Sequence, residues 1–275
     1  MSGLEQKKLY ALLELPQEVI EALNGYEAGR MKEIPEEIYQ KLFERNQWED
    51  GIKELQNYLG DDPMGMKILW ELLHIVCRYT YAEYEKRGIA EEIFVATMKF
   101  CTRFLNEHYA TWGTYKFVWA WWFPRQLSVK EFRIGALEYE FVDGHEREIA
   151  VHIPSDADMG IDSIKQSLSA FDSFREHYFA DWKDVKLTCD SWMLMPELQE
   201  FLGDSSRIVS FQKLFEIEHI DREATWYMGW IYPGYEGPKE ALPEKTKLQR
   251  ELKKFLLEGK KFGIAKGYMN KKFFS

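Results

Sequence analysis

The 275-residue sequence lacks the features that mark several large classes of protein. Its three cysteines contain no C-x-x-C pair and its six histidines no H-E-x-x-H, so we expect reduced thiols and no metal site. Its longest stretch without a charged residue, 224–235, is shorter than the roughly 18 residues of a membrane helix. The N-terminus has no basic segment followed by an apolar one and therefore does not resemble a signal peptide. These absences predict a cytoplasmic protein without a membrane partner.

Basic charge is scarce in all but the last part of the chain. The net charge is −10, which argues against nucleic acid as a partner, because phosphate backbones are repelled. Residues 129–244 carry 11 basic and 24 acidic side chains, whereas residues 245–275 carry 10 and 2. The basic tail either meets an anionic ligand or docks on the acidic middle, and we favour docking. Docking predicts a buried stripe of Leu248, Leu252, Phe255 and Leu256, with Lys247, Arg250, Lys253 and Lys254 outside or at its rim. The sequence predicts no oligomeric state.

The apolar residues that are present follow two different periods. Residues 1–125 repeat at helical spacing and predict an all-helical domain. After Ser128 the period changes to two, so residues 126–275 predict a second domain with a mixed sheet. The fold class is therefore α+β. Between the halves, the aromatic run 117–123 is expected to be buried, or alternatively to form a wall for an acyl or aromatic ligand.

The second half predicts the order β-β-α-β-α-β-β-α-β. A half-buried strand, in which Leu137, Tyr139 and Phe141 alternate with Glu138 and Glu140, leads through an Asp143-Gly144 turn into a strand over 149–153. A helix over about 162–178 and a strand over 185–190 follow. A right-handed crossover would make strands 149–153 and 185–190 parallel neighbours. Beyond them, 208–220 is expected to be mostly extended, with further strands at 226–231 and 262–269 and a basic helix at 245–258.

Two regions after strands carry candidate chemistry, although the common nucleotide-binding and hydrolase motifs are absent. The loop before the helix at 162 presents backbone N–H groups that can hold a pyrophosphate. Alternatively Asp162 is an ordinary N-cap, and the three aspartates at 156, 158 and 162 favour this reading. His152 faces away from the aliphatic residues of its strand and is either a general base or a hydrogen-bonded structural histidine. Cys189 lies in phase with the apolar residues of its strand, which indicates a core thiol rather than a nucleophile.

Several segments resemble a known bacterial family. They are His152-Ile153-Pro154, Cys189-x-Ser191-Trp192-x-Leu194-x-Pro196-x-Leu198, Ser206-Arg207-Ile208-x-x-Phe211-x-x-x-Phe215 and the Phe132–Phe141 segment. Together they resemble acyltransferase-domain-containing proteins, which join a helical N-acyltransferase N-terminal domain to a C-terminal domain similar to GNAT N-acetyltransferases. The resemblance implies that strand 149–154 splays from its neighbour and pairs with pantetheine, while loop 155–163 holds the pyrophosphate. The implied cofactor-binding residues are Val151, Ile153, Pro154, Ser155, Gly160 and Ile161.

The sequence departs from the GNAT pattern at two places. The usual [QR]-x-x-G-x-[GA] phosphate loop is replaced by Ser155-Asp156-Ala157-Asp158-Met159-Gly160. No tyrosine lies between residues 179 and 226, where the family commonly has the residue that protonates the CoA thiolate. These departures support an alternative function, a non-catalytic binding or regulatory module on a GNAT-like scaffold.

The function that we expect first is acyl transfer from acetyl-CoA or another acyl-CoA to the amine of a small molecule or peptide. His152, or a water that it holds, would be the base, and Ser191 is a weaker candidate for the acid. Backbone N–H groups of 151–154 would lie near the oxyanion. Asp190 and Trp192 are expected to line an acceptor groove together with His152 and Ser191.

Overall fold

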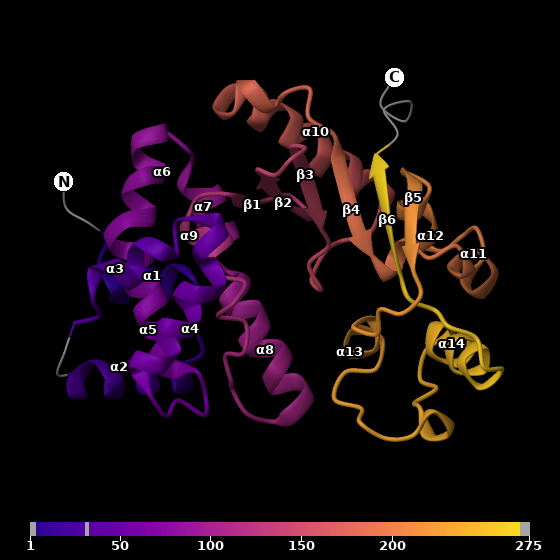
Figure 1. Ribbon diagram of the computed structural model, residues 1–275, viewed down its shortest axis with the longest axis horizontal. Helices are drawn as coiled ribbons and strands as arrows, with labels where there is room; N and C mark the ends of the chain where they lie inside the picture. Colours follow the sequence, from indigo (N-terminus) through magenta and orange to yellow (C-terminus); the bar gives the residue numbers. More distant parts are fainter. Residues whose placement is uncertain (1–3, 31–32, 270–275) are drawn as a thin grey trace. The chain divides into compact units, whose positions relative to one another are not determined.

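A computed structural model describes residues 4–30 and 33–269 of the chain. The chain divides into two compact units, residues 1–134 and residues 135–275, which are described separately below (Figure 1). The division at residues 125 and 126 that the change of period indicates stays a prediction. Among the described residues, no helix combines the length and the apolar composition that crossing a membrane requires.

The first unit is built almost entirely of helices that pack around apolar side chains. A π-helical turn, Val76–Thr80, joins α5 to α6, and three leucines of α5, Leu69, Leu72 and Leu73, have no exposed surface. The elements of this unit are α1 (Gln6–Leu12), α2 (Gln17–Gly29), α3 (Glu36–Lys41), α4 (Trp48–Leu59), α5 (Met66–Ile75), α6 (Tyr81–Arg87), α7 (Glu91–Met98), α8 (Phe100–Trp112), α9 (Pro124–Leu127) and the short strand β1 (Glu131–Ile134).

The aromatic run 117–123 is only partly buried. Phe117 and Phe123 are buried and meet the ring of Phe100 edge to face, at centroid distances of 6.3 and 4.7 Å. Trp121, by contrast, leaves 53% of its surface exposed. The expectation of a buried run is therefore right for its two phenylalanines and wrong for Trp121. Burial recurs at every third position, 117, 120 and 123, while Val118 and Trp121 are exposed.

The second unit combines strands and helices, which confirms the predicted α+β class of a helical region followed by a mixed sheet. Its first strands and first helix follow the predicted order closely. The elements are β2 (Leu137–Val142), β3 (Glu148–His152), α10 (Ile161–Tyr178), β4 (Leu187–Ser191), α11 (Glu197–Leu202), α12 (Arg207–Gln212), β5 (Phe215–Asp221), α13 (Tyr227–Ile231), α14 (Lys247–Leu257) and β6 (Ile264–Met269).

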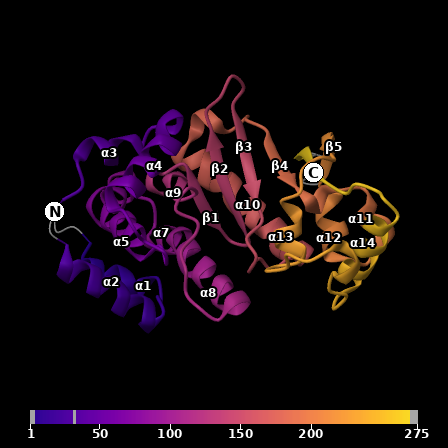
Figure 2. The same cartoon turned by 60° about the horizontal axis from the view of Figure 1, so that its bottom comes forward.

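The strands of this unit lie in the order β2-β3-β4-β6-β5. β2 and β3 form an antiparallel hairpin in which Tyr139 pairs with Val151 (Figure 2). β3 pairs with β4 in parallel, as the crossover through α10 predicts. β6 then lies antiparallel between β4 and β5. This pattern places the carboxyl ends of β3 and β4 side by side.

Two predicted strands are helical instead. Arg207–Gln212 forms α12, so only the second part of the predicted extended segment 208–220 is a strand, β5. Tyr227–Ile231 forms α13, which buries Tyr227 and Ile231, four residues apart. Short apolar runs do not distinguish strands from helices by periodicity alone, and both segments are too short to show a helical repeat.

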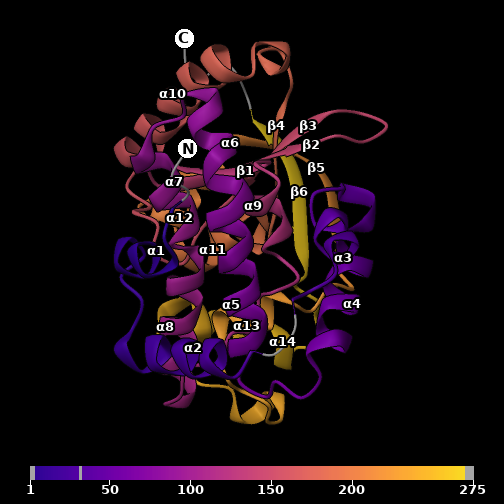
Figure 3. The same ribbon diagram turned by 90° about the vertical axis from the view of Figure 1, so that its left-hand side faces the viewer.

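Helix α10 covers one face of the sheet. Phe171 of α10 stacks on Tyr139 of β2, with ring centroids 3.9 Å apart and planes inclined by 2°. Figure 3 shows α10 and α12 on the same side of β4 and β6. Cys189 of β4 is buried on this side and is therefore a core residue, as predicted. Its burial raises the pKa of the thiol. The opposite face carries the polar residues described below.

Helix α14 docks much as its apolar stripe predicts. Leu252 and Leu256 are buried, Leu248 and Phe255 are half-buried, and Phe255 packs edge to face on Phe201 of α11. The basic residues Lys247, Arg250 and Lys254 are exposed, and the half-buried Lys253 pairs with Glu244 at 2.6 Å.

Thr246 caps α14 through a reciprocal pair of hydrogen bonds. Its Oγ1 accepts from the backbone N–H of Gln249, and its own N–H donates to Oε1 of Gln249. Thr246→Ala removes the side-chain acceptor, and we expect the free energy of unfolding to fall by about 1 kcal/mol. Chemical denaturation measures this change. Thr246→Ser, which keeps the hydroxyl, is the control, and equal losses in the two variants would contradict a capping role.

Candidate functional site

The parallel ladder between β3 and β4 ends before the strands do. Within the described residues it joins Ile149 to Leu187 and Ala150 to Thr188 and goes no further. β3 nevertheless continues to His152, and β4 continues to Ser191. The strands therefore stop pairing at their carboxyl ends, the edge at which open α/β sheets bind ligands.

His152 lies at this end of β3 and contacts a buried carboxylate. Its Nε2 is 3.0 Å from Oε2 of Glu140 on β2, and the side chains are 27% and 4% exposed, respectively. Because an ionised carboxylate only accepts hydrogen bonds, Nε2 carries the proton in this contact, and Nδ1 of a neutral imidazole is then an acceptor. This contact orients the imidazole ring.

Asp190 shares the face of His152. Residues 150 and 152 of β3 lie on the same side as residues 188 and 190 of β4, because Ala150 pairs with Thr188. Partial desolvation raises the pKa of the Asp190 carboxyl, and the charge of Lys266, its register partner on β6, opposes this rise. Lys266 in turn pairs with Glu148 at 2.7 Å. This face of the sheet is thus lined with charged groups of both signs.

Ser191 and Trp192 lie elsewhere. Ser191 alternates with Asp190 and therefore points to the opposite face, where it is buried and its Oγ accepts from the backbone N–H of Met193 at 3.1 Å. Trp192 is also buried, at the start of a single helical turn, Trp192–Leu194. The structure thus brings His152 and Asp190 to one face but does not bring Ser191 there. The roles predicted for all four residues stay predictions.

The residues expected to bind the cofactor form the end of β3 and the loop that follows. Val151 and Pro154 are buried, Ile153 is half-buried, and Ser155 is exposed. Gly160 and Ile161, which follow at the start of α10, are both half-buried. The residues proposed to contact pantetheine are thus followed directly along the chain by those proposed to contact the phosphates.

Gly160 is the N-cap of α10, and among the described residues no side chain caps this helix end. The alternative in which Asp162 is the cap is wrong, because Asp162 lies inside the first turn. Gly160 N–H donates to Oδ1 of Asp158 at 2.9 Å, which holds the loop in place. The backbone N–H groups of the first turn of a helix lack intrahelical partners, so this end of α10 can receive an anion.

The sequence does not indicate that Glu140 contacts His152. Alternation indicates that Glu138 and Glu140 lie on the polar side of a half-buried strand, whereas both are buried. A buried glutamate in an alternating strand gives no signal in the sequence, because periodicity shows which side a residue faces and not whether that side is covered. The register of β2 and β3 pairs His152 with Glu138 and Ala150 with Glu140, so Glu140 reaches the imidazole diagonally across the hairpin.

Two family models together match nearly the whole chain. The N-acyltransferase N-terminal domain matches residues 5–129, and the GNAT-like C-terminal domain matches residues 132–269. The chain therefore belongs to the acyltransferase family with these two domains, which confirms the resemblance seen in the sequence. No curated protein matches the sequence.

Solved structures share the fold over most of their length. An acyltransferase in complex with decanoyl-CoA and teicoplanin superposes with a TM-score of 0.75 at 17% identity, covering 96% of this chain and 87% of its own. An acyltransferase in complex with CoA and 10C-teicoplanin has the same TM-score and identity, with coverages of 98% and 88%. A mutant acyltransferase in complex with octanoyl-CoA is similar at 16% identity, with a TM-score of 0.75 and coverages of 96% and 87%.

Proposed function

We propose that this protein transfers an acyl group from an acyl-CoA thioester to the amine of a small-molecule or peptide acceptor. The observation that carries the proposal is the early end of the β3–β4 ladder beside His152, in a chain that belongs to this acyltransferase family. The similar structures hold decanoyl-CoA, octanoyl-CoA or CoA, and two of them hold a teicoplanin. They support acyl-CoA as the donor, and they support an acceptor of the small-molecule or peptide class.

In the proposed reaction no covalent enzyme intermediate forms. The amine nitrogen attacks the thioester carbonyl, a C–N bond forms, and the C–S bond then breaks. His152, directly or through a water that it holds, takes the proton that the amine loses. Backbone N–H groups of 151–153 stabilise the oxyanion, and the departing CoA thiolate takes up a proton. Glu140 holds the imidazole by accepting from Nε2–H.

Calorimetric titration with acetyl-CoA, octanoyl-CoA and decanoyl-CoA tests the donor. We expect at least one of them to bind, with the preferred chain length showing the highest affinity. Absence of binding by all three at high micromolar concentration would contradict the proposal. Binding without turnover of any offered amine would favour the alternative, a binding or regulatory module, which the missing glycine motif and the missing tyrosine support.

Glu140 is expected to act as a positioning residue for His152. Glu140→Gln keeps the size of the side chain and an acceptor oxygen but removes the negative charge that stabilises an imidazolium. We expect kcat to fall about 10-fold, with the KM for acyl-CoA unchanged. A general base contributes about 10²-fold or more to the rate, and this variant keeps the base but loses the negative charge that stabilises its protonated form. Steady-state kinetics measures this split. A parallel rise in KM would indicate that Glu140 supports the structure of the site instead.

A further inference from the structure

Arg207 stands beside the loop that leads into α10. It is the first residue of α12, a helix that packs against α10. Its Nη1 lies 3.8 Å from Oδ1 of Asp158, and the two side chains are 73% and 66% exposed. The guanidinium therefore reaches, from a different segment of the chain, the region that the proposed function gives to the phosphates of acyl-CoA.

This loop needs a positive charge to hold a diphosphate. It carries three carboxylates, at positions 156, 158 and 162, and it lacks the glycine motif of related phosphate loops. A helix N-terminus supplies the equivalent of only about half a positive charge. Carboxylates near a bound diphosphate would repel it, so backbone N–H groups alone would bind it weakly. Arg207 brings a cation to this loop.

The contact between Arg207 and Asp158 is of the kind that a ligand can replace. Exposed ion pairs contribute little, and the separation of 3.8 Å is long for a charge-assisted hydrogen bond. Asp158 is fixed independently of Arg207, since its Oδ1 accepts from the N–H of Gly160. A guanidinium group can donate two parallel hydrogen bonds to phosphate oxygens. At 3.8 Å, Arg207 does not form such a bidentate pair with Asp158.

We propose that Arg207 binds the diphosphate of acyl-CoA, leaving Asp158 when the donor enters. The inference rests on the proposed function, and it assigns a donor-binding residue from α12 that replaces the charge missing from the loop. The opposing charge of Asp158 then weakens donor binding, so the two residues have opposite effects on affinity.

Calorimetry with the full chain and octanoyl-CoA tests this role. We expect Arg207→Ala to weaken binding about 10-fold, the effect of one lost charge-assisted hydrogen bond, and Asp158→Asn to strengthen it several-fold. Lys213→Ala is the matched control, because Lys213 is an exposed cation that directly follows the same helix and pairs with Asp204 at 2.8 Å. We expect it to bind as the wild type does.

Truncated donors identify the group that Arg207 contacts. The loss in Arg207→Ala should persist with octanoyl-dephospho-CoA, which lacks only the 3′-phosphate, and vanish with octanoyl-pantetheine, which lacks all phosphates. A loss that vanishes already with dephospho-CoA, or that persists with pantetheine, overturns the assignment to the diphosphate. Unchanged octanoyl-CoA binding in Arg207→Ala overturns the inference alone. If the wild type binds none of octanoyl-CoA, decanoyl-CoA and acetyl-CoA, the proposed function itself is contradicted.

Discussion

Replacing His152 with alanine is expected to lower kcat about 100-fold or more, while the chain still folds and still binds acyl-CoA. The size follows from the usual contribution of a general base to the transition state. The imidazole is held by Glu140 at 3.0 Å and is 27% exposed, so its removal opens little of the core. Steady-state kinetics with the acceptor amine measures the change in kcat, and calorimetry measures donor binding separately.

A second histidine provides the matched control for this prediction. His145 lies exposed in the connection between β2 and β3, and His145→Ala should leave kcat unchanged. His152→Ala with an unchanged rate would show that His152 is structural and that solvent takes the proton. Loss of acyl-CoA binding in His152→Ala would likewise contradict a role confined to proton transfer.

The central part of the site follows from local sequence patterns. The alternation at 149–153, the helical stripe of α10 and the alternation at 185–190 together define a strand, a helix and a strand, and handedness then requires parallel neighbours. The same alternation puts His152 and Asp190 on one face. These inferences succeed because period and connection length act over short distances along the chain.

The contacts that complete the site depend on distant residues. Glu140 meets His152 through the register of a hairpin, and Arg207 meets Asp158 through the packing of α12 on α10. Neither pairing leaves a periodic signal. The sequence also predicts extended chain where α12 forms, so it does not indicate that Arg207 begins a helix. Sequence patterns therefore define the strands that hold the site, and tertiary packing selects the charges that act in it.

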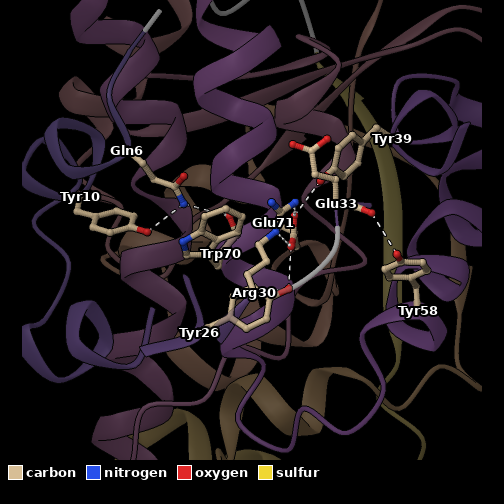
Figure 4. A network of polar contacts seen from close by, with 9 residues as sticks. All are labelled: Gln6, Tyr10, Tyr26, Arg30, Glu33, Tyr39, Tyr58, Trp70 and Glu71. Carbon is tan, nitrogen blue, oxygen red and sulfur yellow. Dashed lines mark hydrogen bonds and ion pairs between the residues drawn. The ribbon is translucent and has the colours of Figure 1, made fainter. Parts of the chain in front are cut away.

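A buried carboxylate organises the first unit in a similar way. Glu71 of α5 has no exposed surface, yet it accepts four hydrogen bonds (Figure 4). Tyr26 and Tyr39 donate to it at 2.7 and 2.8 Å, and Arg30 donates through Nε at 2.8 Å and Nη2 at 3.2 Å. Burial, together with the charge of Glu71, raises the pKa of both tyrosines, so they stay neutral donors at physiological pH. The network joins α2, α3 and α5.

Glu71→Ala is expected to lower the free energy of unfolding of the first unit by about 3–5 kcal/mol, because Arg30 then keeps a partly buried charge without its partner. Two tyrosine hydroxyls lose their acceptor at the same time. Guanidinium unfolding followed by circular dichroism measures the change. Glu83→Ala is the control, since its pairs with Lys86 and Arg87 are partly exposed and should contribute about 1 kcal/mol or less. Equal effects of the two substitutions would contradict this role. They would mean that water accepts the hydrogen bonds of Arg30 and both tyrosines without a loss of stability.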